Sequence, residues 1–157
     1  MKINTIKANR KYIRNLDREE NAKTSSRAFA IYNHGTGIHE IVIPHHCNTK
    51  TRLHELGHCF LGHCQDNRKR MLMSDIIGQE LDADLYAYEK TNKSFSVESA
   101  INIANQVMLE YNIPVSLTFN LILKHLKSKH ILIRDSDRSY LWHECKSIYN
   151  VRNSEKQ

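Results

Sequence analysis

The chain contains few of the residues that interrupt regular structure. Its 157 residues include only 5 Gly and 2 Pro, which excludes a collagen-like or Pro/Gly-rich low-complexity protein. The four cysteines form no CxxC pair, and no apolar run approaches the roughly 18 residues that a membrane-spanning helix needs. No apolar segment follows the basic N-terminus, so we expect no secretory signal. These absences favour a soluble cytoplasmic protein without membrane contact, in which the cysteines remain thiols.

Positive charge and histidine are present in excess. The net charge is +6, and the chain has 10 His. The basic residues are spread along the sequence without a basic-aromatic stripe or a known nucleic-acid motif, so we expect any contact with nucleic acid to be indirect or non-specific. The histidines are therefore the more informative feature.

The order of apolar patterns predicts an α+β protein, with a small antiparallel sheet and about five helices. Residues 1–27 form a basic N-terminal segment with a weakly indicated helix over residues 5–20. A single domain is expected over residues 28–150, followed by a frayed tail over residues 151–157.

Two β-rich runs, 28–32 and 38–43, flank a Gly-containing turn and predict a hairpin. A helix should follow from Asn48 or Thr49 to about Cys64, and Phe60 lies on the side of this helix expected to face the core. Further helices are predicted over about 75–88, 97–111, 114–129 and 136–149.

The most informative segment is HELGH, residues 54–58. Histidines at positions i and i+4 of a helix lie on one face with Cβ atoms about 6 Å apart, so His54 and His58 can both bind one Zn²⁺ at about 2.0–2.1 Å. Glu55 projects about 100° around the helix, where it can reach a water on the metal but cannot easily become a third ligand. The segment therefore predicts two zinc ligands and a general base.

A catalytic zinc site usually has three protein ligands and keeps a fourth position for water. The candidate third ligand is Glu80, near the start of the next predicted helix. Asp84 lies one turn further along the same face and could accept a hydrogen bond from the ring of a zinc-bound histidine. Small residues on that side, Ala83 and Ala87, would allow the two helices to approach closely.

Two stretches, HELGHCFLGH (residues 54–63) and ELDADLYA (residues 80–87), resemble the gluzincin metallopeptidases, whose HExxH motif is followed by a ligand Glu, often within ExxxD. Within that clan they look most like the ImmA/IrrE group, in which small domains often have HELGHxxLGH followed by ExxAN or ExxAD. The resemblance covers roughly residues 28–90. It implies a zincin-like fold and a zinc-dependent endopeptidase that hydrolyses a peptide bond in a protein substrate.

Residue by residue, the resemblance implies that His54, His58 and Glu80 bind Zn²⁺, that Glu55 is the catalytic base and that Asp84 supports the ligands from outside. The hairpin would supply the edge strand along which gluzincins lay an extended substrate, and we expect strand 38–43 to hold the substrate backbone. The group's known roles are regulatory, such as cleavage of a DNA-bound repressor. Without a helix-turn-helix pattern in this chain, DNA binding would belong to a partner.

Alternatives remain open at the ligands. The metzincin motif HExxHxxGxxH fails, because positions 61 and 64 are Leu and Cys. Asp82 is the main rival of Glu80 as third ligand. His63 should point about 140° away from His58 if the helix continues that far, which argues against a ligand role.

Other histidines and cysteines have simpler explanations. His45, His46 and Cys47 are expected at the strand end beside the cleft rather than at a second metal site. Cys59 and Cys64 are expected to be small, buried apolar residues.

Two functional questions also stay open. The oxyanion-stabilising donor is not determined by the spacing, and the candidates are Tyr88, Tyr111, His125, His130, Tyr140 and His143. A second hypothesis, motivated by the +6 charge, is a zinc-stabilised module that binds protein or nucleic acid without turnover. It requires a side chain on the fourth zinc position, such as His45, His46 or one from the C-terminal tail.

Overall fold

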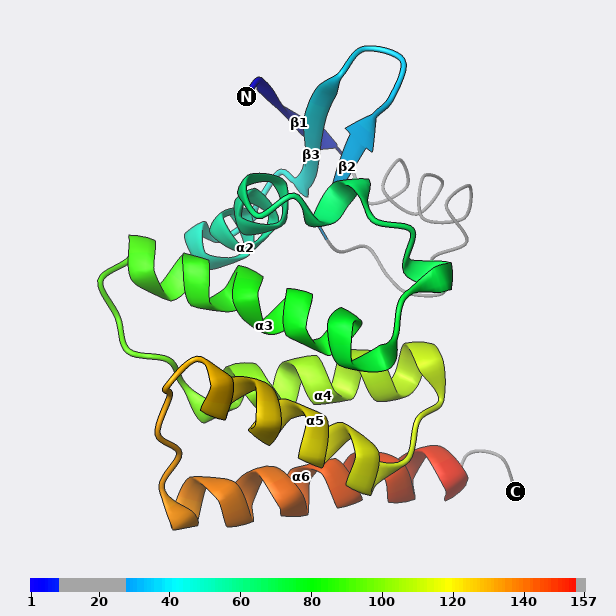
Figure 1. Cartoon of the computed structure of the whole chain (residues 1–157), viewed down its shortest axis with the longest axis vertical. Helices are drawn as coiled ribbons and strands as arrows, with labels where there is room; N and C mark the ends of the chain where they lie inside the picture. The colour runs from blue at the N-terminus through cyan, green and yellow to red at the C-terminus, as the bar shows by residue number, and fades with distance from the viewer. Residues whose placement is uncertain (9–27, 155–157) are drawn as a thin grey trace. The chain divides into compact units, whose positions relative to one another are not determined.

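The computed structural model describes residues 1–8 and 28–154. These residues form an α+β protein with a three-stranded sheet and five α-helices (Figure 1). They divide into two compact units: Met1–Met71 with Asp82–Lys93, and Leu72–Leu81 with Ser94–Gln157. The boundary falls within α3 (Met73–Lys90), so one continuous helix belongs to both units.

The sheet has the strand order β1-β3-β2. In it, β2 (Phe29–Asn33) is antiparallel to β3 (Ile38–Pro44), which confirms the predicted hairpin. The prediction of an antiparallel sheet is wrong, because β1 (Ile3–Ala8) pairs with β3 in parallel and makes the sheet mixed. As a result β3 is the central strand and is covered on both of its hydrogen-bonding sides.

The first strand lies in a region where we predicted the start of a helix. Residues 5–8 belong to β1, and the rest of the predicted helix lies outside the described residues. The two isoleucines of β1, Ile3 and Ile6, are spaced by three, which suits a helix. In the structure they pack against different clusters, Ile3 with Ile41 and Ile43 and Ile6 with Val42. A strand with one apolar side chain packed on each face produces that spacing equally well.

The helix with the HELGH segment is α2 (Thr49–Phe60). It begins where predicted, because the side chain of Asn48 accepts a hydrogen bond of 2.7 Å from a backbone N–H of the first turn. It ends before the predicted Cys64, because Gly62 adopts a left-handed conformation with φ of 78°. Two short 3-10 helices follow, η1 (His63–Gln65) and η2 (Arg68–Arg70).

Phe60 does not face the core as predicted. Its side chain is 55% exposed, and its ring stacks on Tyr86 of α3 with centroids 5.7 Å apart. The last residue of a helix that stops early lies at the edge of the packed surface, so the helical periodicity no longer determines its burial.

The second unit contains α4 (Val97–Tyr111), α5 (Val115–Ser128) and α6 (Asp135–Ser154), which lie side by side in Figure 1. The predicted starts near residues 97 and 114 are confirmed, with Ser96 as the N-cap of α4 and Pro114 as the N-cap of α5. In contrast, α6 continues through residues 151–154, where we expected a frayed tail. Of the helices within the described residues, none is long and apolar enough to cross a membrane.

These helices and the first turns of α3 enclose an apolar core. Its fully buried members are Ile77, Leu81, Ala100, Ala104, Met108, Ile122, Leu126, Leu141 and Cys145. Burial, with a smaller effect of Glu144, raises the pKa of the Cys145 thiol to about 11. This cysteine therefore stays protonated and acts as a small apolar residue.

Candidate metal centre

The candidate centre lies where α2 packs against the middle and second half of α3. A Cβ added to Gly57 would lie only 3.0 Å from the backbone oxygen of Ala83 and 3.2 Å from the Cβ of Tyr86. Ala83 and Ala87 are fully buried. Small residues on both helices therefore allow an unusually close approach, which brings polar side chains on the facing surfaces into contact.

Three of these side chains converge. His54, His58 and Glu80 each place one potential ligand atom within 4.8 Å of the other two. The Nε2 atoms of His54 and His58 are 3.0 Å apart. Two zinc ligands at 2.0–2.1 Å and a tetrahedral angle are about 3.3 Å apart, so the rings would need to separate by only about 0.3 Å to share an ion.

Asp84 orients the first of these rings. Its Oδ1 is 2.6 Å from His54 Nδ1. An ionised carboxylate only accepts hydrogen bonds, so Nδ1 carries the hydrogen and Nε2 keeps its lone pair for a metal. Glu80 lies one turn before Asp84 on the same continuous helix, and the helix itself therefore fixes its position beside the histidines.

His63 contacts the second ring, contrary to our expectation. Its Nδ1 is 3.1 Å from His58 Nδ1. The expected angle assumed a helix that continues past Phe60, whereas Gly62 turns the chain and brings His63 back. In the tautomer in which His58 Nδ1 donates in this contact, His58 Nε2 carries a lone pair 3.0 Å from His54 Nε2, and one cation can bind both nitrogens. The donor set and its hydrogen bonds thus fit Zn²⁺.

Two further residues, Lys50 and Tyr88, lie on this face, and Lys50 was not among the residues predicted from the sequence. Lys50 places its Nζ 3.5 Å from Asp84 Oδ2 and 4.8 Å from the ring centroid of Tyr88. Lys50 precedes His54 by four residues, and Tyr88 follows Asp84 by four, so the spacing could have placed them on the facing stripes. Tyr88, one of the oxyanion candidates, thus has a lysine ammonium over its ring.

Glu55, the expected base, is buried at 7% exposure. Its negative charge also acts on the thiol of Cys47. Burial is the main cause that raises the pKa of this thiol, and the charge of Glu55 is the second cause. Among the described residues, neither Asp82 nor His45 nor His46 belongs to the group of ligand atoms around His54. The remaining oxyanion candidates lie in the second unit: Tyr111, His125, His130, Tyr140 and His143.

The expected substrate strand requires a correction. Strand 38–43 lies within β3, which pairs with β1 on one side and β2 on the other. It therefore has no free hydrogen-bonding side for a substrate. Within the described sheet, β2 is an edge strand and also contacts α2 and η1.

Comparisons with known proteins identify no relative of this chain. No protein-family model matches it, and neither the curated proteins nor the solved structures give a match. The resemblance to the gluzincins therefore stays a prediction based on residues 54–63 and 80–87, and the geometry above is the evidence for a metal site.

Proposed function

We propose that this chain is a zinc-dependent endopeptidase that cleaves a protein substrate. The observation that carries the proposal is the convergence of His54, His58 and Glu80 within 4.8 Å, with one imidazole oriented by Asp84. Two imidazoles and one carboxylate leave a fourth tetrahedral position for water or substrate. That open position distinguishes catalytic zinc sites from closed structural ones.

Each residue at the candidate centre would have one role in peptide hydrolysis. When bound, Zn²⁺ polarises the scissile carbonyl and lowers the pKa of its water toward 7. The Glu55 carboxylate accepts a proton from the attacking water and donates it to the leaving amine nitrogen. Asp84 keeps the hydrogen on His54 Nδ1, so that Nε2 remains directed at the centre.

The edge of the sheet suggests how a substrate would bind. An extended peptide adds to a free strand edge through main-chain hydrogen bonds. Because β3 is central, we assign this role to β2 (Phe29–Asn33), which contacts the helix that carries both histidines. The exposed ring of Phe60, stacked on Tyr86, offers an apolar surface at the end of the same helix.

Glu55→Gln tests the mechanism, because it removes the base and keeps the ligands. Wild-type and variant protein, loaded with zinc, are incubated with cell-lysate proteins, and new N-termini are counted by mass spectrometry. We expect Glu55→Gln to retain its zinc and to lose cleavage by about 10²–10⁴-fold. Glu89→Gln is the matched control, since Glu89 lies on the exposed side of α3 and the charge change is the same.

Two outcomes would contradict the proposal. Equal cleavage by wild type and Glu55→Gln would exclude Glu55 as the base. Zinc binding without any new N-terminus from wild type would favour the interaction module instead. That alternative needs a side chain on the fourth position, and among the described residues neither His45 nor His46 joins the ligand group.

A further inference from the structure

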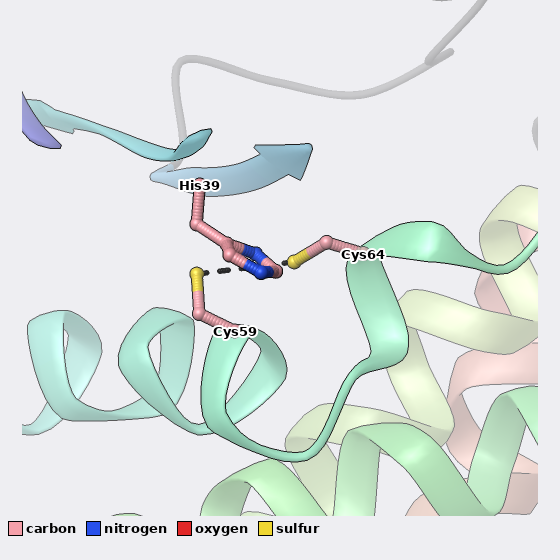
Figure 2. Close-up of side chains that lie close together, drawn as sticks. All are labelled: His39, Cys59 and Cys64. Atoms are coloured by element: carbon pink, nitrogen blue, oxygen red, sulfur yellow. Dashed lines mark hydrogen bonds between the residues drawn. The ribbon is translucent and has the colours of Figure 1, made fainter. Parts of the chain in front are cut away.

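A second group of metal-ligating side chains lies beside the last turn of α2. His39 of β3, Cys59 of α2 and Cys64 of η1 point toward one another (Figure 2). Their potential ligand atoms all lie within 4.8 Å of one another. The three residues come from three different elements, so the group is assembled by the fold and has no short sequence motif.

We propose that His39, Cys59 and Cys64 bind a second Zn²⁺ ion, which holds β3, α2 and η1 together. One imidazole and two thiolates form a ligand set that suits zinc, because sulfur and imidazole nitrogen are its preferred donors. The ion would be structural, and the proposal does not depend on the peptidase activity.

The spacing of the two sulfurs fits this assignment. The Sγ atoms of Cys59 and Cys64 are 3.9 Å apart. Two thiolates bound to one zinc at about 2.3 Å and a tetrahedral angle are about 3.8 Å apart. A disulfide would need about 2.05 Å, and both cysteines are free in the structure. The sulfurs therefore already have the separation that zinc requires.

His39 distinguishes a metal site from ordinary packing. Cys59 is 1% exposed and packs with Ile41 and Ile43, as a small apolar residue would. His39, however, is 5% exposed, and its Nδ1 is buried without a hydrogen-bond partner among the described residues. Buried polar atoms in folded proteins almost always have a partner. A metal ion bound to the two sulfurs and to Nδ1 of this ring would supply one.

The position of the group suggests its effect. Cys59 directly follows His58, and Cys64 directly follows His63. The rings of these two histidines meet at 3.1 Å. An ion that fixes both cysteines would therefore also fix the turn that brings His63 to His58.

Cobalt substitution tests the proposal on the full chain. The reduced protein is stripped of metal and loaded with Co²⁺, whose charge-transfer absorption in the near ultraviolet requires a thiolate ligand. We expect this band in wild type and also in the His54→Ala/His58→Ala variant, which lacks the first centre. Zinc content should fall from about two ions per chain to about one in either His54→Ala/His58→Ala or Cys64→Ser, since each loses one centre.

Controls within the chain make the result specific. Cys64→Ser should lose the cobalt band, whereas Cys47→Ser and Cys145→Ser should keep it. If Cys64→Ser does not fold, alkylation of wild type replaces it: zinc should protect the partly exposed Cys64 and leave the alkylation of Cys47 unchanged. Three outcomes would each overturn the proposal. They are absence of the band in wild type, equal alkylation of Cys64 with and without zinc, and a Cys59–Cys64 disulfide that persists under reducing conditions.

Discussion

At the scale of single residues, Asp84 lies 2.6 Å from His54 Nδ1 and 3.5 Å from Lys50 Nζ at the candidate centre. Asp84→Asn keeps the shape of the side chain but removes the charge that makes it an obligatory acceptor. We expect zinc affinity to fall by about 10–100-fold, which is typical when the outer partner of a ligand histidine is lost. Competition with a chromophoric chelator measures the affinity.

Asp82→Asn is the matched control, because the same chemical change is made two residues away on the same helix. We expect it to leave the zinc affinity unchanged, since Asp82 is not part of the described ligand group. A loss at Asp82 that equals or exceeds the loss at Asp84 would make Asp82, the rival considered from sequence, the better candidate.

His63→Ala tests the contact with His58. The substitution removes the ring that holds His58 Nδ1 at 3.1 Å, so the orientation of the ligand ring is no longer fixed. We expect zinc affinity to fall by about 10-fold, with little change in fold. His45→Ala is the control, because His45 is exposed and outside the ligand group. An unchanged affinity in His63→Ala would mean that the contact does not support the centre.

These residues differ in how well sequence could identify them. A contact between Asp84 and a zinc-binding histidine could be predicted from helical faces, because these residues lie well inside their helices; that His54 is the partner came from the structure. His63 lies beyond the end of α2, where the helical angle no longer applies and one left-handed glycine sets the direction. His39 is contributed by a strand, and no local spacing connects it to Cys59 and Cys64.

At the scale of elements, Gly57→Ala tests the close packing of α2 on α3. Alanine favours a helix over glycine by up to about 1 kcal/mol, but its Cβ would lie 3.0 Å from the backbone oxygen of Ala83. Backbone atoms cannot give way as a flexible side chain can, so the helices must separate. We expect a net loss of about 1–3 kcal/mol in the free energy of unfolding, measured by urea denaturation, together with weaker zinc binding.

Gly35→Ala is the control for that experiment. Gly35 lies in the turn between β2 and β3, and an added Cβ would meet only the side-chain oxygen of Asn33, at 3.3 Å. We expect a smaller loss of stability and no change in zinc affinity. If Gly57→Ala bound zinc as tightly as wild type, close helix approach would not be what assembles the centre.

Helices could be predicted better than the sheet because their boundaries are encoded locally. Asn48, Ser96 and Pro114 begin α2, α4 and α5 as predicted. Strand order depends on pairing between distant segments, and no local pattern in β1 indicates that it joins β3 in parallel. Because of that single pairing, β3 is the central strand and not an edge strand. We therefore propose β2, and no longer β3, as the strand to which a substrate would pair.

At the scale of the whole molecule, α3 belongs to both compact units, and a different part of the helix packs in each unit. Ile77 and Leu81 in its first half are buried in the core of α4, α5 and α6. Ala83 and Asp84 in its second half contact α2. We expect one domain over residues 28–150 from the sequence, and a helix that changes partner halfway along its length shows no break in its pattern.

The elements that carry the candidate ligands predict where metal removal acts. Among the described residues, both candidate metal groups draw their ligands from β3, α2, η1 and the middle of α3, and none comes from α4, α5 or α6. A ligand that binds only the folded state stabilises the parts whose opening disrupts its site. We therefore expect chelation to increase amide hydrogen exchange in β3 and α2, while the core amides around Leu126 and Leu141 keep their protection.

Addition of the chelator to metal-free protein is the control and should not change the hydrogen exchange. Equal deprotection of α4, α5 and α6 by chelation would show that the two units unfold together, and metal binding would then stabilise the entire described chain.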